Sequence, residues 1–376
     1  MSVDIGQNRL LSLDVFRGMT IAGMVLVNNP GTWSQIYAPL KHAEWHGATP
    51  TDYIFPFFLF IVGIAIPLAL GKRVEQGGVT RDVYLKIFRR FAVIFLLGLF
   101  LAAFPFFDFT TLRIPGVLQR IAVCYLIASL IFIHTDWKKQ IFIAIGLLLV
   151  YWGLMTLINV PSCETTSVDD KACNLAAYLD RLVLGENHIW KSAKVFDPEG
   201  ILSTIPAIVT TLSGVLTGLW LKTKRSDLEK VGGIFFFGIV LIAFGWCWHL
   251  FFPMNKSLWT SSYVVYTSGL ALCFLGFCYW LIDIKNYKKW TTPFLILGVN
   301  ALALFVFSGL LAEILGIIKV PNGAGKEISL QGWIFESVFL PFASPMNASL
   351  MYAVSYIFLW LFLMWLLYRK QIFIKV

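Results

Sequence analysis

The densest group of chemically reactive side chains lies between residues 41 and 52. His42, Glu44 and His46 stand in the stretch Lys-His-Ala-Glu-Trp-His-Gly, and Asp52 follows. Histidine is the usual general base near neutral pH, because its unperturbed pKa lies close to the working pH. The spacing differs from the His-Glu-x-x-His pattern of zinc hydrolases, so no metal site is predicted. The segment therefore predicts general-base chemistry, or alternatively polar residues that only anchor a loop at a membrane surface.

Three charged residues lie in otherwise apolar stretches. Asp14 and Arg17 are three positions apart and so share one helical face, whereas Arg120 has no acidic residue three or four positions away. A charge in the hydrocarbon region costs at least about 2.5 kcal/mol, so such residues usually serve a function. Asp14 and Arg17 are either a self-neutralising pair near the membrane surface or a cation held for an anionic ligand. Arg120 must find its partner on another helix or in a ligand.

The composition shows which elements must position these side chains. Of the 376 residues, 58% are hydrophobic and only 14% are charged, and the mean hydropathy is +0.75. Soluble domains contain about a quarter charged residues, so this profile excludes a soluble globular protein. It also excludes a disordered chain, a secreted disulfide scaffold and a nucleic-acid binder. The net charge of +9 is interpreted as membrane topology, because Lys and Arg concentrate on cytoplasmic loops.

We predict an all-α, polytopic membrane protein that forms a single integral-membrane domain over residues 1–376. A helix needs roughly 20 apolar residues to cross the bilayer. The ten predicted spans are 10–29, 51–71, 88–106, 115–134, 140–160, 200–221, 231–251, 262–282, 292–317 and 347–368. Most basic residues, including the dense cluster from Lys72 to Arg90, then face the cytoplasm, as do both termini. Asp14 and Arg17 interrupt the first span, which favours a retained helix over a cleavable signal.

Two predicted extracytoplasmic loops, 161–199 and 318–346, are long enough to cover a site. Cys163 and Cys173 share the first loop and are disulfide candidates if that side is oxidising. The other cysteines lie in spans and are interpreted as small packing residues: Cys124, Cys247, Cys273 and Cys278.

Two polar motifs have simple structural interpretations. Asp197-Pro198-Glu199-Gly200 is typical of helix entry, where Pro and acidic residues suit the helix dipole, so capping is the simplest role. Trp259 is interpreted as a residue of the aromatic belt at the membrane surface.

Several stretches match one known family in its order along the chain. They are Arg9–Gly18, Lys41–Trp45 leading into Thr51–Pro56, Gly116–Ala122, Asp197–Pro206, Asn255–Ser262 and Gly298–Leu302. In these stretches the chain resembles the heparan-alpha-glucosaminide N-acetyltransferase family of membrane acyltransferases, including bacterial relatives labelled NagX-like. The resemblance implies a membrane enzyme that takes acetyl from cytosolic acetyl-CoA and delivers it to the amino group of a glucosamine on the far side.

The resemblance also implies roles for individual residues. The catalytic histidine of the family lies in a His-Ala-x-Trp motif, which matches His42, and an assisting asparagine matches Asn28, with Asn29 as the alternative. Other polar residues of these stretches are expected to bind substrate or cofactor: Asp14, Arg17, Gln119, Arg120, Asp197, Asn255, Lys256, Trp259 and Asn300. A homodimer is suggested as well, and neither a metal nor a nucleic acid is expected.

On this basis we expect His42 to accept the proton of the sugar ammonium while Asn28 positions the thioester carbonyl or its oxyanion. Arg17 and Arg120 would line a polar crevice for CoA. The expected location is a bacterial inner membrane with His42 on the periplasmic side. Direct transfer and a route through acetyl-His42 both remain open, as do the acceptor sugar and the length of the acyl group.

The alternative function is an inner-membrane transporter for an amino sugar such as N-acetylglucosamine. Asp14, Arg17 and Arg120 would then form a site near the middle of the membrane. The absence of a convincing internal repeat weakens this alternative, because many transporters are built from inverted halves.

Overall fold

The structure is a computed structural model that describes residues 10–161, 163–321 and 326–374. Apart from one two-stranded sheet, the regular secondary structure of the described chain is helical, which confirms the prediction of an all-α protein. The chain forms two compact units. Unit 1 contains Met1–Lys41, Ser226–Phe235 and Leu272–Lys375, and unit 2 contains His42–Arg225 and Phe236–Ala271.

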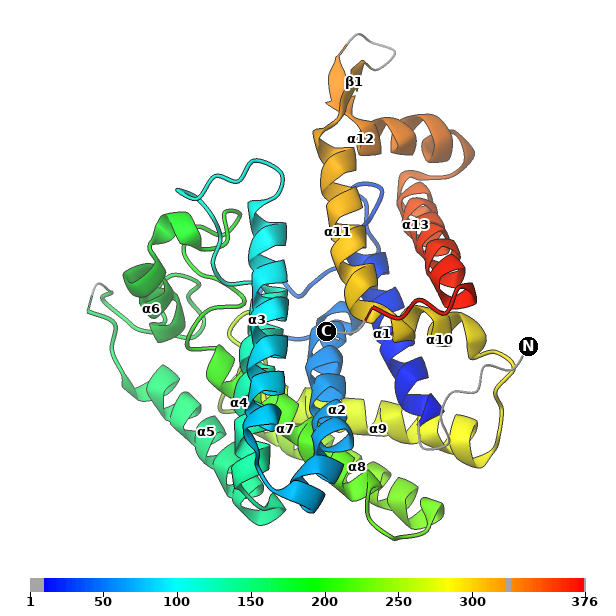
Figure 1. Ribbon diagram of the computed structural model, residues 1–376. Helices are drawn as coiled ribbons and strands as arrows, with labels where there is room; N and C mark the ends of the chain where they lie inside the picture. The colour runs from blue at the N-terminus through cyan, green and yellow to red at the C-terminus, as the bar shows by residue number, and fades with distance from the viewer. Residues whose placement is uncertain (1–9, 162, 322–325, 375–376) are drawn as a thin grey trace. The chain divides into compact units, whose positions relative to one another are not determined.

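Unit 2 is built around two helices in close backbone contact, α2 and α7 (Figure 1). A Cβ atom added to Gly63 would lie 2.0 Å from the carbonyl oxygen of Thr211, and one added to Gly214 would lie 2.0 Å from that of Phe60. Small residues at such positions let apolar helices approach closely. The main helices of this unit are α2 (Ile54–Gly77), α3 (Arg81–Ala103), α4 (Val117–His134), α5 (Trp137–Leu157), α6 (Leu175–Leu184) and α7 (Thr204–Leu221).

Two helices have residues in both units, α8 (Asp227–His249) and α9 (Ser261–Cys278), and α9 continues into the π-helical turn η4 (Tyr279–Ile284). The other short helical turns are η1 (Ala38–Leu40), η2 (Pro50–Tyr53), η3 (Glu186–His188), η5 (Phe335–Phe339) and η6 (Leu340–Phe342).

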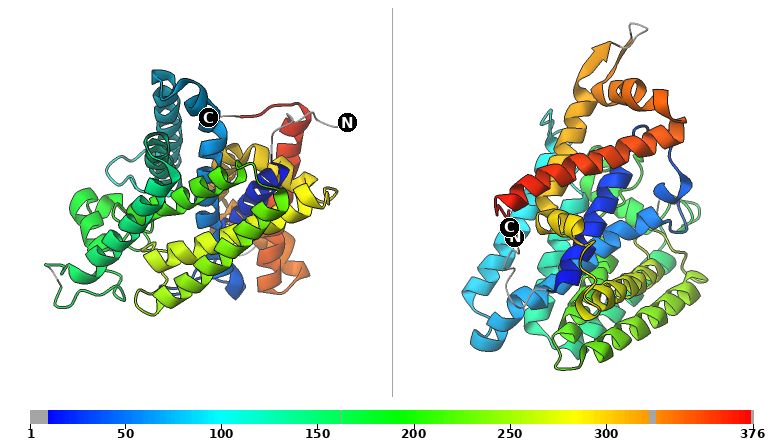
Figure 2. Two further views of the ribbon diagram at one scale, coloured as in Figure 1. Left: turned by 90° about the horizontal axis from the view of Figure 1, so that it is seen from below. Right: turned by 90° about the vertical axis from the view of Figure 1, so that its right-hand side faces the viewer.

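Unit 1 centres on the crossing of α1 (Leu11–Asn28) and α10 (Thr292–Val299). A Cβ atom on Gly18 would lie 1.8 Å from the carbonyl oxygen of Phe294, so only glycine allows this contact. The C-terminal helix α13 (Pro345–Arg369) packs against both α1 and α10 (Figure 2). The remaining elements are α11 (Ala301–Ile317), β1 (Lys319–Pro321), its antiparallel partner β2 (Glu327–Ser329) and α12 (Leu330–Ile334).

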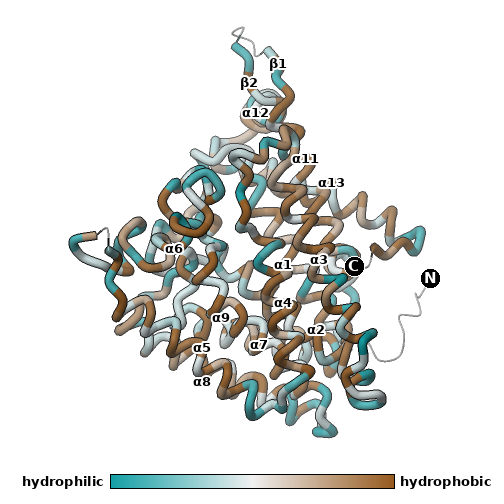
Figure 3. Tube along the Cα trace, turned by 60° about the vertical axis from the view of Figure 1, so that its left-hand side comes forward, coloured by the Kyte–Doolittle hydropathy of each residue, from teal (hydrophilic) through white to brown (hydrophobic). Residues whose placement is uncertain are grey.

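Among the described residues, eight helices are long and apolar enough to cross a membrane, or nine if α10 and α11 count as one broken span. Figure 3 shows the apolar character of these helices and the more polar segments at many of their ends. The protein is therefore an integral membrane protein, as predicted, with fewer straight spans than the ten expected. The predicted span 88–106 corresponds to α3, whose first half carries Lys86, Arg89 and Arg90 and which is not among the eight.

The predicted span 292–317 is not one straight helix, because α10 and α11 meet at an angle of 80°. Asn300 separates them with a non-helical backbone, and its carbonyl accepts the N–H of Leu304 in the first turn of α11. An asparagine at a helix start favours such a break, because its conformation ends the preceding helix. A hydropathy average does not detect the change of direction.

Candidate active site

His42 and Asp52 form a close pair in unit 2. His42 Nδ1 lies 2.6 Å from Oδ1 of Asp52, which belongs to η2 directly before α2. The side chain of His42 is 47% exposed, whereas that of Asp52 is 1% exposed. A carboxylate that accepts the Nδ1–H bond holds the imidazole in one tautomer and leaves Nε2 as the basic nitrogen. The pair can therefore accept a proton from a substrate.

The turn that contains Asp52 also holds its carboxylate in place. Thr49 donates its backbone N–H and its hydroxyl to Oδ2 of Asp52 at 2.9 and 3.0 Å, and Ala43 donates its N–H at 3.1 Å. This is a capping box, which explains Thr and Asp three positions apart at a helix entry. Tyr263 donates its hydroxyl to the backbone carbonyl of Asp52. Oδ2 is thus anchored to backbone, and Oδ1 is directed to His42.

Lys256, from the segment between α8 and α9, lies beside the same imidazole. Its Nζ is 3.2 Å from Nδ1 and 3.3 Å from Nε2 of His42. Because Nδ1–H is donated to Asp52, Nε2 is the nitrogen that can accept a bond from Lys256. Burial lowers the pKa of Lys256, although the negative charges of Glu199 and Asp52 oppose this shift. A substrate must therefore displace the Lys256 ammonium from Nε2 before this nitrogen can accept a proton.

The segments that carry His42 and Lys256 are joined through their backbones. Gly47 donates its N–H to the carbonyl of Met254 at 2.8 Å, and its φ of +99° is a conformation that glycine adopts without strain. Asn255 is fully buried, and its Oδ1 accepts a backbone N–H of its own turn. Asn255, predicted to bind substrate, is therefore placed in the turn that presents Lys256.

Arg113, between α3 and α4, binds two acidic residues. Its Nε and Nη2 donate to both carboxylate oxygens of Asp197 at 2.8 and 2.6 Å, and Nη2 also donates to Glu199 at 2.5 Å. Burial alone would lower the pKa of Arg113, but its interactions with both acids raise this pKa overall. Burial alone would raise the pKa of Glu199, but the positive charges of Arg113, Arg120 and Lys256 lower it overall. Arg113 therefore stays positively charged and Glu199 negatively charged in this largely buried cluster.

This cluster corrects the capping interpretation of Asp197 and Glu199. Helix α7 begins at Thr204 with Ser203 at its N-cap position, so the two acids lie outside its first turn. Arg113 occupies their carboxylates instead, because a guanidinium forms paired bonds with a carboxylate. The predicted role of Asp197 in binding substrate stays a prediction.

Arg120 finds its partners on the segment before α7. Its Nη2 donates to the carbonyl of Gly200 at 3.1 Å and to the hydroxyl of Ser203, and its Cζ lies 5.1 Å from the ring centroid of Trp259. Trp259 is fully buried and donates its Nε1–H to Thr210, so its assignment to the aromatic belt is wrong. Within the described chain, Nε and Nη1 of Arg120 lack hydrogen-bond partners.

The loop 161–199 packs against the residues next to His42. Trp45 donates its Nε1–H to the carbonyl of Val168 at 2.9 Å, and Nε2 of His46 lies 2.8 Å from Oδ1 of Asp169. These bonds use His46 to hold the loop, which agrees with assigning the base role to His42.

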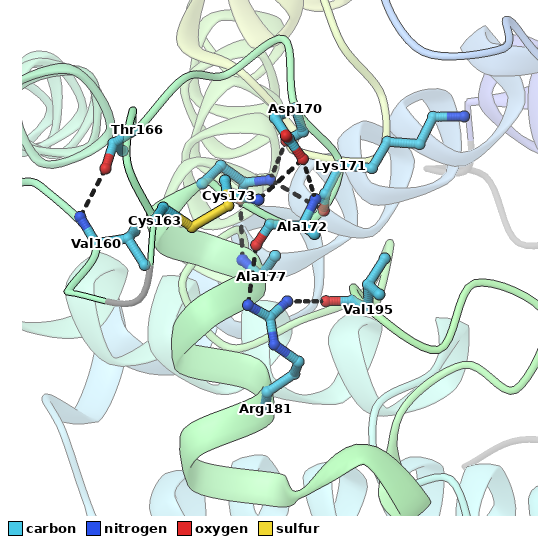
Figure 4. The surroundings of a disulfide bond; sticks show 11 residues. Val160, Cys163, Thr166, Asp170, Lys171, Ala172, Cys173, Ala177, Arg181 and Val195 are labelled. Atoms are coloured by element: carbon cyan, nitrogen blue, oxygen red, sulfur yellow. Dashed lines mark hydrogen bonds between the residues drawn. A yellow bond between two sulfur atoms is a disulfide. The ribbon is translucent and has the colours of Figure 1, made fainter.

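A disulfide between Cys163 and Cys173 closes the start of this loop (Figure 4). Directly after it, Arg181 of α6 reaches back and donates to the carbonyls of Ala172, at 2.9 Å, and Val195. The loop is therefore held by a covalent link at one end and by an arginine in its middle.

We expect that removal of this disulfide loosens the loop. In the loop-closure model, a ring of this size contributes about 3 kcal/mol. The double variant Cys163→Ser with Cys173→Ser should therefore show amide hydrogen exchange roughly 100-fold faster over residues 163–185. Hydrogen exchange with mass spectrometry would detect this, with Cys247→Ser in α8 as the control. Unchanged protection of the loop in the double variant would contradict the expectation.

Asp180 of α6 is a buried acid beside the Arg120 partners. Its Oδ1 accepts the N–H of Ile201 at 2.8 Å, and a Cβ atom on Gly200 would lie 1.9 Å from Oδ2, so only glycine fits there. Burial raises the pKa of Asp180 to about 6, the bond from Ile201 opposes the shift, and the charge of Asp197 adds to it.

This raised pKa predicts a pH-dependent stability. A carboxyl whose folded pKa exceeds its unfolded value stabilises the fold below the unfolded pKa, and this contribution is lost as the pH rises through about 6. Asp180→Asn keeps an acceptor for Ile201 but cannot ionise. The variant should match the wild type near pH 4 and exceed it by up to about 3 kcal/mol at pH 7. Melting in detergent between these pH values would test this, and parallel curves for the two proteins would refute it.

In unit 1, the structure distinguishes Asn28 from Asn29. Asn29 is buried and donates its side-chain amide to the carbonyl of Val25 at 2.8 Å. Asn28, the last residue of α1, is exposed and lines a cavity of about 190 Å³ together with residues of α11. Asn29 also lines this cavity, but Asn28 is the exposed asparagine of the two.

The remaining predicted binding residues have structural contacts. Arg17 donates to Asp14 at 3.0 Å, and its side chain is 21% exposed. Gln119 is buried, and a Cβ atom on Gly98 would lie 2.3 Å from its Oε1. Asn300 uses both ends of its amide, donating to the carbonyl of Ile372 and accepting the N–H of Ile374.

The sequence alone assigned no role to Arg113, Asp180 or Glu313, and it indicated Asp52 only as part of the reactive segment and Glu199 only as a capping residue. The Thr-x-x-Asp pattern directly after His42 was an available signal for Asp52, because a capping box fixes a carboxylate at a helix entry. Arg113 and its acids are more than 80 residues apart, so their pairing has no local signal.

Comparison with known proteins relates the chain to one family. Residues 9–227 match the family described as heparan-alpha-glucosaminide N-acetyltransferase, catalytic. The human heparan-alpha-glucosaminide N-acetyltransferase is 30% identical, over 68% of this chain and 46% of that protein. The mouse protein is 28% identical, over 68% and 47%. The chain thus spans about half the length of these relatives, and the matched family region contains both His42 and Asp52.

Proposed function

Because the chain belongs to the heparan-alpha-glucosaminide N-acetyltransferase catalytic family, we propose that it transfers acetyl from cytosolic acetyl-CoA to an extracytoplasmic glucosamine-type sugar. The observation that carries the proposal is the His42–Asp52 pair, in which an exposed imidazole is hydrogen-bonded to a buried carboxylate. The names of the human and mouse relatives support the reaction and the class of acceptor.

In this mechanism, Nε2 of His42 removes a proton from the sugar ammonium and frees the nitrogen lone pair. The amine attacks the thioester carbonyl, the new C–N bond forms, and the C–S bond breaks. Asp52 stabilises the imidazolium until His42 gives this proton to the leaving CoA sulfur, and the nitrogen of the new amide loses its second proton to solvent. The assisting role predicted for Asn28, a residue of unit 1, stays a prediction.

A second route uses the same residues with a covalent intermediate on Nε2 of His42. The imidazole would first take the acetyl group, release CoA and then pass the acetyl group to the amine. A burst of free CoA and acetylated protein without acceptor would support this route. In direct transfer, CoA is released only when both substrates are present.

The disulfide supports an extracytoplasmic position for His42. Disulfides persist in oxidising compartments such as the periplasm, and the loop closed by Cys163 and Cys173 contacts Trp45 and His46. We propose the periplasmic side of a bacterial inner membrane for this surface.

The surroundings of Arg120 and Arg17 support different roles for these two arginines. Arg120 is buried at 2% exposure and holds the carbonyl of Gly200, so a positioning role suits it better than a phosphate contact. Arg17 is partly exposed beside Asp14 and is the better candidate for an anionic part of CoA.

A product assay tests the proposal. Purified protein in lipid nanodiscs is incubated with acetyl-CoA and a panel of glucosamine-ended acceptors, and acetylated sugar and free CoA are followed by mass spectrometry. We expect equal amounts of both products. Sugar accumulation in protein-containing vesicles without acetyl-CoA, combined with no acetylated product, would instead establish the transporter alternative.

A further inference from the structure

A cavity in unit 1 lies between one face of α1 and one face of α11. Its volume is about 190 Å³, and its lining residues recur at helical spacing on each helix, as expected for two facing surfaces. The apolar part of the lining comprises Met24, Val25, Phe305, Gly309 and Ala312, and the polar part comprises Asn28, Asn29, Ser308 and Glu313.

Glu313 is the one charged residue of this lining. It lies within the apolar helix α11, between Ala312 and Ile314, and its side chain is exposed. Within the described residues, the side chains of Glu313 and Asn28 make no hydrogen bond or ion pair with the protein. A carboxylate in an apolar segment is costly and normally marks a functional site with a specific partner.

The neighbouring polar groups indicate what that partner carries. Asn28 offers an amide with both donors and an acceptor, and the Ser308 hydroxyl donates to the carbonyl of Phe305 but can still accept a bond. A carboxylate prefers a cation, and an amide with a hydroxyl suits sugar hydroxyls. The lining therefore fits a small ligand that combines an ammonium group with hydroxyl groups.

The size of the cavity limits the ligand further. Pockets for drug-sized ligands have volumes of about 300–1,000 Å³, so this cavity is smaller than those. It has room for about six water molecules at liquid density. Such a space accepts one sugar ring but not an extended oligosaccharide.

We infer that Glu313 binds the ammonium group of a single amino-sugar residue in this cavity, with Asn28 and Ser308 contacting its hydroxyl groups. The inference deepens the proposed function, on which the choice of an amino sugar as ligand rests. It predicts that the protein recognises the terminal sugar of any longer acceptor and that recognition depends on the free amine.

The test compares binding of glucosamine and N-acetylglucosamine to the protein in nanodiscs without acetyl-CoA, by calorimetry. The two sugars differ in that only glucosamine carries an ammonium. Glu313→Gln should weaken glucosamine binding by about 10- to 100-fold, because a hydrogen bond to a charged group is lost. Binding of N-acetylglucosamine should change by less than about threefold, because no ion pair is involved.

Two further variants complete the test. Glu336→Gln removes a carboxylate from the exposed turn η5, outside the cavity lining, and should change neither affinity. Ala312→Leu narrows the cavity and should weaken both sugars. The inference is overturned if the wild type does not bind glucosamine, if Glu313→Gln leaves glucosamine binding unchanged, or if it weakens both sugars equally.

The outcomes separate this inference from the proposed function. If glucosamine binding depends on Glu313 but the wild type forms no acetylated sugar, the transferase proposal fails and the binding site stands. If the wild type acetylates glucosamine and Glu313→Gln leaves the KM for glucosamine unchanged, the binding site fails and the transferase proposal stands.

Discussion

Alanine in place of His42 is expected to lower kcat for acetyl transfer by about 10³-fold or more. General-base catalysis contributes about 10²- to 10⁴-fold, and the variant also loses the group that returns the proton to the leaving sulfur. The side chain is 47% exposed, so its removal leaves no large cavity in a core. The loss should therefore appear in turnover, with the melting temperature nearly unchanged.

The measurement is steady-state turnover of acetyl-CoA with glucosamine, with acetylated sugar as the product counted. His46→Ala is the matched control, because this second histidine is bonded to Asp169 and Asn255 and has no catalytic role in the proposal. We expect it to lose less than about tenfold, in line with removal of a loop contact. A His42→Ala protein that keeps a tenth of wild-type turnover would rule out the base assignment.

The second large effect is expected from Asp52→Asn, with a fall in kcat of about 10²- to 10⁴-fold and a KM for the acceptor that changes little. The reason lies in the orientation of the amide. Oδ2 of Asp52 accepts the N–H groups of Ala43 and Thr49, so the asparagine oxygen must take that position to satisfy both donors.

This orientation turns the amide nitrogen of the variant toward Nδ1 of His42. Nδ1 must then accept a bond, and the imidazole proton moves to Nε2, the nitrogen that has to act as base. The fold remains intact, since the capping box is kept. The variant is therefore expected to lose activity through the wrong tautomer rather than through unfolding.

Nitrogen-15 NMR of the protein with labelled histidine would report the tautomer directly, alongside the kinetics. Asp169→Asn is the control, because it alters the partner of the other histidine and its carboxylate is 73% exposed. If Asp52→Asn retains both the Nδ1–H tautomer and most of the turnover, Asp52 does not orient the base.

The sequence by itself determined the class of the protein and predicted where its chemistry lies. Whether a helix can cross a membrane depends on the hydropathy of its own consecutive residues, so the membrane helices were predictable from local composition. The family was identifiable from short motifs such as the one around His42. The same local patterns placed Cys163 and Cys173 in one loop, whereas Asn28, the last residue of α1, was selected through the family resemblance.

The partners of these residues were decided only by the tertiary structure. Arg113 meets Asp197 and Lys256 meets His42 across 84 and 214 positions of the chain. Charge pairing depends on distance in space, and hydropathy or motif spacing carries no information about such distances. For the same reason, Trp259 was assigned to a membrane surface although it packs under Arg120.

The bend at Asn300 and the cavity beside Glu313 could not be predicted from the sequence for a related reason. The mean hydropathy of an apolar stretch is the same whether the helix is straight or bent by 80°. A single glutamate barely changes this mean. Only the packing of α1 against α11 shows that this glutamate and Asn28 line the same cavity. Local composition thus determines that helices form, whereas their mutual packing determines which side chains can act together.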